Sequence, residues 1–333
     1  MTELITASAI GAIGTFIITV LILRKLIPVL KSKKMGQPIL DIGPRWHMSK
    51  EGTPVMGGLS FIAASVVLGA ALAVYFGVTR SAKTVVPLIL SLTYGVICGL
   101  IGMIDDLAKL RKKQNEGLKA WQKLALQFIA AALFVAGLAF FCGRTTELYI
   151  PFVGVRLDLG IWYYVIAVIL LAGVDNSVNL NDGIDGLCSS VTLVVGAFFF
   201  AVSVFRFGGE NESLSVMSAL IFGSAAGFLV YNFHPARIFM GDTGSLYFGA
   251  VVAACAFIAD NPLIIVVAGF MYILETLSVI LQVAYFKLTH GKRLFKMAPI
   301  HHHLEKCGFG EIKIVVIFTL LSAAFCAAAW FGF

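Results

Sequence analysis

The chain has 333 residues, of which 59% are hydrophobic and only 13% are charged, and its formal net charge is +7 at pH 7. An ordinary soluble domain carries about 25% charged residues, so this composition excludes a water-soluble surface. The abundance of apolar and aromatic residues also excludes a disordered chain. The composition therefore predicts a polytopic membrane protein.

The apolar stretches, taken in chain order, predict ten membrane-spanning helices. They are continuous rather than alternating, and many reach the roughly 20 residues that a helix needs to cross the hydrocarbon, which favours helices over a β-barrel. The predicted spans are 4–23, 57–77, 85–104, 124–142, 161–178, 188–205, 215–232, 244–259, 262–286 and 314–332. We therefore predict an all-α, polytopic integral membrane helical bundle.

The connections between these spans predict one domain and one short hairpin. The longest connections have about 20–35 residues, which is too short for an independent core. Residues 1–333 are therefore expected to form a single integral membrane domain. Residues 148–158 alternate in hydrophobicity, and we expect a short external hairpin there, to which the sequence assigns no function.

The placement of Lys and Arg predicts the orientation of the bundle. The odd-numbered loops, taken as 24–56, 105–123, 175–187, 233–243 and 287–313, contain 20 of the 25 basic residues. Because basic loops tend to remain in the cytoplasm, we expect these loops on the cytoplasmic face and both termini outside. The positive charge is then a topology signal, with attraction to anionic lipid as a second role, and it requires no nucleic acid partner.

Histidines and carboxylates are concentrated in the same loops. All six histidines and 11 of the 18 carboxylates fall there, and Glu275 is the one carboxylate within a predicted span. A secondary transporter, the alternative class of protein, would place ionisable groups near the bilayer midplane and would show inverted repeats. The distribution instead favours an enzyme that works at the inner interface on a water-soluble partner and a lipid partner.

The first acidic cluster, Asp105 and Asp106, follows the third predicted span. Neighbouring helical residues point about 100° apart, so one carboxylate can approach a metal while the other faces a different ligand. Lys109 is placed to pair with Asp105 on the same helix face. Basic residues able to hold phosphates follow at Arg111, Lys112, Lys113, Lys119 and Lys123. The structural alternative is a solvated helix end.

The second cluster is the loop 175–187, which has three Asp, three Asn and no basic residue. Unpaired carboxylates at a low-dielectric boundary are costly. The loop therefore requires a bound cation, basic residues from other loops, or hydrogen-bond donors on a ligand. Gly183 and Gly186 allow the backbone to approach such a ligand closely. A simple turn would explain the Asn, Asp and Gly content, but not the charge.

Two further clusters precede the eighth and tenth predicted spans. Asp242, between Gly241 and Thr243, suits an Mg²⁺ carboxylate, and Asp242 or Thr243 is alternatively a helix N-cap. The histidine triplet 301–303 is internal, which excludes a purification tag. Its side chains would diverge on a regular helix or strand, so contacts to phosphate oxygens are favoured over a metal triad.

Five motifs in order, KEGTPVMGG, DDLAK, NLNDGIDG, NFHPARIFMGDTGS and MAPIHHHLE, resemble the phospho-N-acetylmuramoyl-pentapeptide transferase family. This family is a branch of the polyprenyl-phosphate N-acetylhexosamine-1-phosphate transferases. The resemblance implies a ten-helix, Mg²⁺-dependent phosphoglycosyl transferase of the bacterial inner membrane, usually a homodimer, with its active site on the cytoplasmic face. It also implies the first membrane step of peptidoglycan synthesis, in which UDP-MurNAc-pentapeptide and undecaprenyl phosphate give lipid I and UMP.

The resemblance also implies roles for particular residues. Matching the family's catalytic positions are Asp105, Asp106, Asp242, Lys109, Lys123, His301 and His302, with Asp242 and Asp105 as metal ligands. Matching its substrate-binding positions are Lys50, Asn179, Asp182, Gly183, Ile184, Asp185, Asn232, Phe239, Gln282 and His303. Val55 replaces a threonine usual in the family, so no hydroxyl contact is expected there, and Asn181 stands where Thr is common.

Two alternatives remain open within this interpretation. The lipid phosphate attacks the diphosphate directly, with Asp105 deprotonating or orienting it, or an Asp first forms a covalent intermediate. A related branch that uses UDP-GlcNAc or UDP-GalNAc would share the Asp motifs, whereas the PIHHHLE string (299–305) favours the muramoyl branch.

Overall fold

A computed structural model describes residues 1–33, 36, 50–112 and 117–333. Residues 34–35 and 37–49 of the first predicted cytoplasmic loop, together with Lys113, lie outside the described residues. Among the described residues, ten helices are long and apolar enough to cross a membrane. This confirms the predicted helical bundle and its number of spans.

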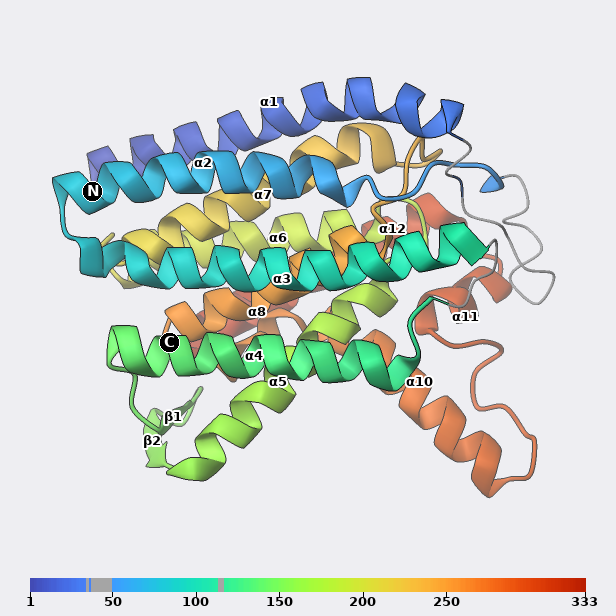
Figure 1. Cartoon of the computed structure of the whole chain (residues 1–333). Coiled ribbons are helices and arrows are strands. Elements are labelled where there is room, and N and C mark those ends of the chain that lie inside the picture. Colours follow the sequence, from blue (N-terminus) through green and yellow to red (C-terminus); the bar gives the residue numbers. More distant parts are fainter. Residues whose placement is uncertain (34–35, 37–49, 113–116) are drawn as a thin grey trace.

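The long helices lie side by side as one bundle (Figure 1). They are α1 (Thr2–Ser32), α2 (Gly58–Thr79), α3 (Ala82–Lys112), α4 (Ala120–Cys142), α5 (Ile161–Asn181), α6 (Leu187–Ala201), α7 (Glu212–Asn232), α8 (Gly241–Ile258), α10 (Phe270–Leu288) and α12 (Glu311–Ala329). The shorter elements are a π-helical continuation of α6 (Val202–Arg206), α9 (Ile264–Ala268), α11 (Ile300–Lys306), a final 3₁₀ turn (Trp330–Gly332) and the strands β1 (Glu147–Ile150) and β2 (Val155–Asp158).

Helix α8 is the centre of the bundle. Every residue from Thr243 to Ile258 is buried, and the helix packs against α3 and α5. A helix that is apolar on all sides is stable only when neighbouring helices surround it. The closest approach to α3 is at Gly102, where a Cβ would collide with the backbone of Asp242. This glycine allows the end of α3, with its two carboxylates, to lie against the start of α8.

The structure corrects two predicted spans. Helix α5 continues to Asn181, beyond the predicted end at 178. Asp175, which the overlapping predicted ranges 161–178 and 175–187 placed in both a span and a loop, lies fully buried within this helix. Glu275 is therefore not the only carboxylate in a span. The predicted span 262–286 was wrong as one helix, because α9 ends at Ala268 and α10 begins after Gly269. Glycine is a poor helix former, and here it fits closely against the carbonyl oxygen of Ile265.

The predicted hairpin at 148–158 is present as β1 and β2. The strands are antiparallel, with Leu148 opposite Leu157 and Ile150 opposite Val155. The hairpin lies at the end of the bundle where both chain termini are found, away from α11 (Figure 1).

Candidate active site

Three helices bring lysines and an amide to the carboxylate of Asp242, which is on α8. Lys109 Nζ, from α3, lies 2.7 Å from Asp105 Oδ2 and 3.0 Å from Asp242 Oδ2. Lys123 Nζ, from α4, lies 2.8 Å from the same Asp242 oxygen and donates to Asn179 Oδ1 at 3.1 Å. Asn179 Nδ2, from α5, donates to Asp242 Oδ1 at 3.0 Å. These five residues are called the Asp242 cluster below.

Asp106 faces away from this cluster and caps α8. Its carboxylate accepts hydrogen bonds from the backbone N–H groups of Asp242 and Thr243 at 3.1 and 2.9 Å, and from Thr243 Oγ1 at 2.7 Å. The free N–H groups of a helix N-terminus require such acceptors. The prediction that Asp242 or Thr243 would cap α8 was wrong, because a carboxylate from α3 does so. The two adjacent carboxylates do face different partners, as predicted.

The Asp242 cluster has a donor set that fits a magnesium ion. Mg²⁺ is usually held by one or two carboxylates together with waters and substrate phosphates. One oxygen of Asp105 and one of Asp242 lie within 3.0 Å of the same Lys109 ammonium, so a single cation can contact both. The other oxygen of Asp105 accepts from the backbone N–H of Leu118 at 2.6 Å, which fixes the direction of the carboxylate.

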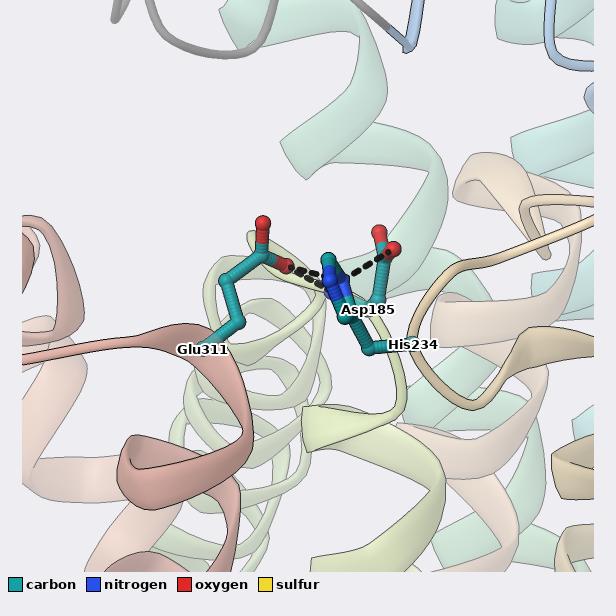
Figure 2. Close-up of side chains that lie close together, drawn as sticks. All are labelled: Asp185, His234 and Glu311. Carbon is teal, nitrogen blue, oxygen red and sulfur yellow. Dashed lines mark hydrogen bonds and ion pairs between the residues drawn. The ribbon is translucent and has the colours of Figure 1, made fainter.

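A second group of charged side chains joins four segments that are distant in the sequence. Lys50 Nζ, from the segment before α2, lies 2.7 Å from both Asp185 Oδ1 and Glu311 Oε2. His234 Nδ1, from the loop after α7, lies 3.1 Å from Asp185 Oδ2 and 3.7 Å from Glu311 Oε2. Figure 2 shows the side chains of Asp185, His234 and Glu311 converging. These four residues are called the Asp185 cluster below.

Three side chains of the Asp185 cluster have the spacing of a metal site. The ligand atoms of Asp185, His234 and Glu311 all lie within 4.8 Å of one another, and this is the group of three His, Cys, Asp or Glu side chains that does so in the part of the chain that the structure describes. They are not the carboxylates predicted as metal ligands. The ammonium of Lys50 contacts both carboxylates, so these side chains form a partly buried ion-pair network whose ligand atoms also have the spacing of a metal site.

Sequence reasoning missed two members of the Asp185 cluster. His234 stands in a motif that was recognised, but no role was predicted for it. Glu311 is the first residue of α12, and its only distinction in the sequence is that it precedes an apolar span. Its importance arises from the fold, which brings the start of α12 to the turn between α5 and α6.

The turn between α5 and α6 receives basic residues from two other predicted loops. The expected partners of its carboxylates were a bound cation, basic residues of other loops, or donors on a ligand. The structure shows the second kind, because Lys50 contacts Asp185 and Lys123 donates to Asn179 in the same region. Among the residues that the structure describes, no basic side chain forms an ion pair with Asp182, in the same turn. Burial, reinforced by the negative charges of neighbouring carboxylates, with Asp242 the strongest, raises the pKa of Asp182 well above its usual value.

Several predicted substrate-binding residues hold the backbone in place. Asn232 accepts from the N–H of Gly186 and donates to the carbonyl of Ile238, each at 3.1 Å. Gln282 accepts from the N–H of Phe295 at 2.8 Å, and the N–H of Phe239 donates to the Pro54 carbonyl at 2.8 Å. These contacts shape the loops around the site.

The three histidines point to different partners, as their spacing predicts. His301 is buried, and its Nδ1 lies 3.1 Å from Glu275 Oε1. Its ring packs against Gly183, where a Cβ would collide with it. Nδ1 of His302 lies 2.6 Å from Glu305, and Nδ1 of His303 accepts from a backbone N–H at 3.1 Å. His301 therefore contacts the turn between α5 and α6 directly.

A buried polar clip lies one helical turn from the Asp242 cluster. Gln127 Nε2, on α4, donates to Asp175 Oδ2 at 2.8 Å, and Asn176 Nδ2 donates to Gln127 Oε1 at 2.9 Å. Gln127 and Asp175 each stand four residues from a member of the cluster, Lys123 and Asn179 respectively. Since residues four apart lie on one helix face, the clip sets the register that brings Lys123 to Asn179.

The fold and the site together define a class of protein. It is a multi-pass helical membrane protein whose polar site, at one end of the bundle, combines ammonium groups with carboxylates. Residues 86–260 match glycosyl transferase family 4.

The similarity to curated relatives identifies the family within this class. Phospho-N-acetylmuramoyl-pentapeptide-transferase of Clostridium botulinum (strain Eklund 17B / Type B) is 45% identical over 305 residues, covering 90% of this chain and 88% of that protein. The proteins of the same name from Clostridium perfringens (strain SM101 / Type A) and Clostridioides difficile (strain 630) are 42% and 40% identical, and they cover 95% and 96% of this chain and 94% and 95% of their own lengths. The chain belongs to the phospho-N-acetylmuramoyl-pentapeptide-transferase family.

Proposed function

We propose that this enzyme transfers phospho-N-acetylmuramoyl-pentapeptide from UDP to undecaprenyl phosphate, with lipid I and UMP as products. The observation that carries the proposal is the convergence of Lys109 and Lys123 on Asp242, with Asp105 alongside. Ammonium groups bind phosphates, and the family relationship supports the choice of a muramoyl substrate. The site would face the cytoplasm in the bacterial inner membrane, within a single domain and a homodimer.

The Asp242 cluster would receive the diphosphate of the nucleotide substrate. Asp242 and Asp105 would hold Mg²⁺, which when bound would neutralise charge on the diphosphate and on the departing UMP. Lys109 and Lys123 would then exchange contacts with the carboxylate for contacts with phosphate oxygens. Their ammonium groups are already held in place by helices, so they require little reorganisation as charge develops.

The turn between α5 and α6 and its neighbours would bind the rest of the substrate. We propose that the nucleotide is bound by Asn179, Asp182, Gly183, Ile184, Asp185, Asn232 and Phe239, and that the sugar-phosphate end is bound by Lys50, Gln282, His301, His302 and His303. Because Asn232 and Gln282 already hydrogen-bond to the backbone, their contribution would be to shape the pocket.

The proposed reaction is a direct displacement. An oxygen of the lipid phosphate, deprotonated or oriented by Asp105, forms a bond to the phosphorus attached to the sugar, and the bond to the UMP oxygen breaks. The rival route uses an aspartate as the nucleophile. Asp106 is a poor choice for that role, because its oxygens accept three hydrogen bonds from the start of α8. A phosphorylated aspartate trapped in a single turnover would overturn the direct route.

The test is UMP release by the detergent-purified protein from UDP-MurNAc-pentapeptide, undecaprenyl phosphate and Mg²⁺. Parallel reactions use UDP-GlcNAc, or omit the lipid. We expect release from the muramoyl substrate that depends on both lipid and Mg²⁺. Release from UDP-GlcNAc alone would instead place the chain in the related branch of the superfamily.

A further inference from the structure

The β1–β2 hairpin has one apolar face and one polar face. Leu148 pairs with Leu157 and Ile150 with Val155, while the alternate pairs are Glu147 with Asp158 and Tyr149 with Arg156. Because side chains alternate between the two faces of a strand, the first two pairs share one face. The hairpin is therefore amphipathic, although it lies outside the helices that span the membrane.

The protein covers only half of this apolar face. On β1, Leu148 is buried in the core and Ile150 packs against it. On β2, Val155 and Leu157 remain 43% and 46% exposed. The uncovered half thus lies along the outer strand of the hairpin.

The exposed apolar surface continues beyond β2 in both directions along the chain. In the turn, Phe152 and Val153 are 56% and 69% exposed. After β2, Ile161 and Trp162 at the start of α5 are 71% and 66% exposed. Contiguous large apolar side chains of this kind on a surface mark contact with another apolar phase.

The polar face is anchored to the bundle. Arg156 and Arg144 both contact the carboxylate of Asp260, after α8, at 2.8 and 2.5 Å. Arg144 also donates to the carbonyl of Ile258 at 2.8 Å. These contacts fix the direction in which the hairpin presents its uncovered apolar edge.

We propose that this edge, formed by Phe152, Val153, Val155, Leu157, Ile161 and Trp162, lies in the bilayer at the boundary between headgroups and acyl chains. The choice of occupant rests on continuity, because α5 is one of the helices able to span a membrane and begins at Ile161. Tryptophan favours this boundary, where its amphipathic ring is partly apolar and partly wet. The hairpin would anchor the end of the bundle opposite the Asp242 cluster.

The test places an environment-sensitive dye at the exposed apolar edge, or on the polar face, of the hairpin in the full-length protein. Val153→Cys and Glu147→Cys are made in a Cys307→Ser background, because Cys307 is exposed. Both variants are labelled, and the unsubstituted background corrects for reaction elsewhere. Each is reconstituted into lipid nanodiscs that contain phosphatidylcholine with a nitroxide on the upper acyl chain, and aqueous iodide is titrated separately.

We expect the dye at position 153 to emit at shorter wavelength and to be quenched several-fold more by the nitroxide lipid than the dye at position 147. Iodide should show the reverse order. Equal quenching at the two positions would overturn the proposal. Protection of position 153 from both quenchers would overturn it as well, because a second copy or another protein would then cover the edge. The readout needs no substrate, so it is independent of the proposed transferase activity.

Discussion

The Asp242 cluster and the Asp185 cluster each contain two carboxylates and two basic side chains, but they differ in the number of ammonium groups. At Asp242, two ammonium groups contact one carboxylate oxygen, at 3.0 and 2.8 Å. At Asp185, one ammonium group is shared by two carboxylates, each at 2.7 Å. Asp242 keeps the ammonium group of Lys109 when Lys123 moves to an arriving phosphate, whereas Lys50 cannot leave without exposing two carboxylates.

The two clusters also differ in what holds them. The members of the Asp242 cluster stand on the spanning helices α3, α4, α5 and α8, whose positions the bundle core fixes. The members of the Asp185 cluster come from turns and from the first residue of α12. The difference indicates that the first cluster is rigid before substrate arrives, while the second cluster is itself what holds its four segments together.

Replacement of Asp242 should give the largest effect on activity. In Asp242→Asn the side chain keeps its size but loses the charge that holds both lysines and a metal. We expect lipid-dependent UMP release to fall on the order of a thousand-fold, the upper range for loss of one preorganised electrostatic group. Asp158→Asn, on the exposed hairpin, is the matched control. A rate like that of the wild type at saturating Mg²⁺ would show that Asp242 holds neither metal nor phosphate.

Replacement of Lys50 should act on stability first. Lys50→Met leaves two carboxylates of the Asp185 cluster facing each other. Removing one partner of a buried ion pair leaves uncompensated charge. We expect a loss of about 2 kcal/mol, below the fully buried value because the Lys50 side chain keeps 13% exposure. The readouts are the apparent melting temperature in detergent and the KM for the nucleotide substrate, which should rise more than kcat falls.

A second substitution separates ion pairing from packing. Adding Glu311→Gln to Lys50→Met removes one of the two stranded charges, so part of the lost stability should return. If the double variant melts at the same temperature as the Lys50→Met protein, the stranded charge of Glu311 is not the cause of the lost stability. A double-mutant cycle gives the coupling between the two side chains directly.

The sequence predicts the bundle well because apolar length is a local property. The ten spans were recognised from runs of apolar residues, and the hairpin from alternation. Helix ends were placed too early, as at 104 and 178, because hydropathy falls where α3 and α5 become polar while the backbone stays helical. The break after Ala268 was missed because apolar residues continue on both sides of Gly269.

Contacts between segments could be predicted only where a motif contains their residues. Asp105, Lys109, Lys123 and Asn179 were chosen from motifs and a basic run, and the fold does bring them to Asp242. Nothing near Glu311 in the sequence indicates a contact with Lys50, because that contact depends on where α12 begins in space. The pairing of Gln127 with Asp175 likewise depends on the register between α4 and α5.

The clip between α4 and α5 tests whether helix register sets the geometry of the Asp242 cluster. Gln127→Leu removes the amide and leaves Asp175 Oδ2 buried without a donor, a loss of about 1–2 kcal/mol. We expect kcat to fall several-fold with little change in KM, since Lys123 shifts relative to Asp242. Replacing both residues by Leu removes both polar groups, which is close to neutral for stability. The clip has no positioning role if the stable double variant turns over at the wild-type rate.

The smallest effect expected is on how stability depends on pH, which should differ between variants at Asp182 and at Asp158. Burial raises the pKa of Asp182. The folded chain therefore keeps the carboxyl proton of Asp182 above about pH 4, where an unfolded Asp releases it. Stability must then decrease as pH rises through this window. Asp158 is the opposite case, because hydrogen bonds from Thr146 and the N–H of Gly160 lower its pKa, and its contribution is lost as pH falls. The readout is the apparent melting temperature, measured without substrate or metal. As pH rises from acid to neutral, the melting temperature of Asp182→Asn should rise relative to that of the wild type, while that of Asp158→Asn should fall. If both variants shift in the same direction, burial does not raise the pKa of Asp182, and the turn between α5 and α6 is open to water.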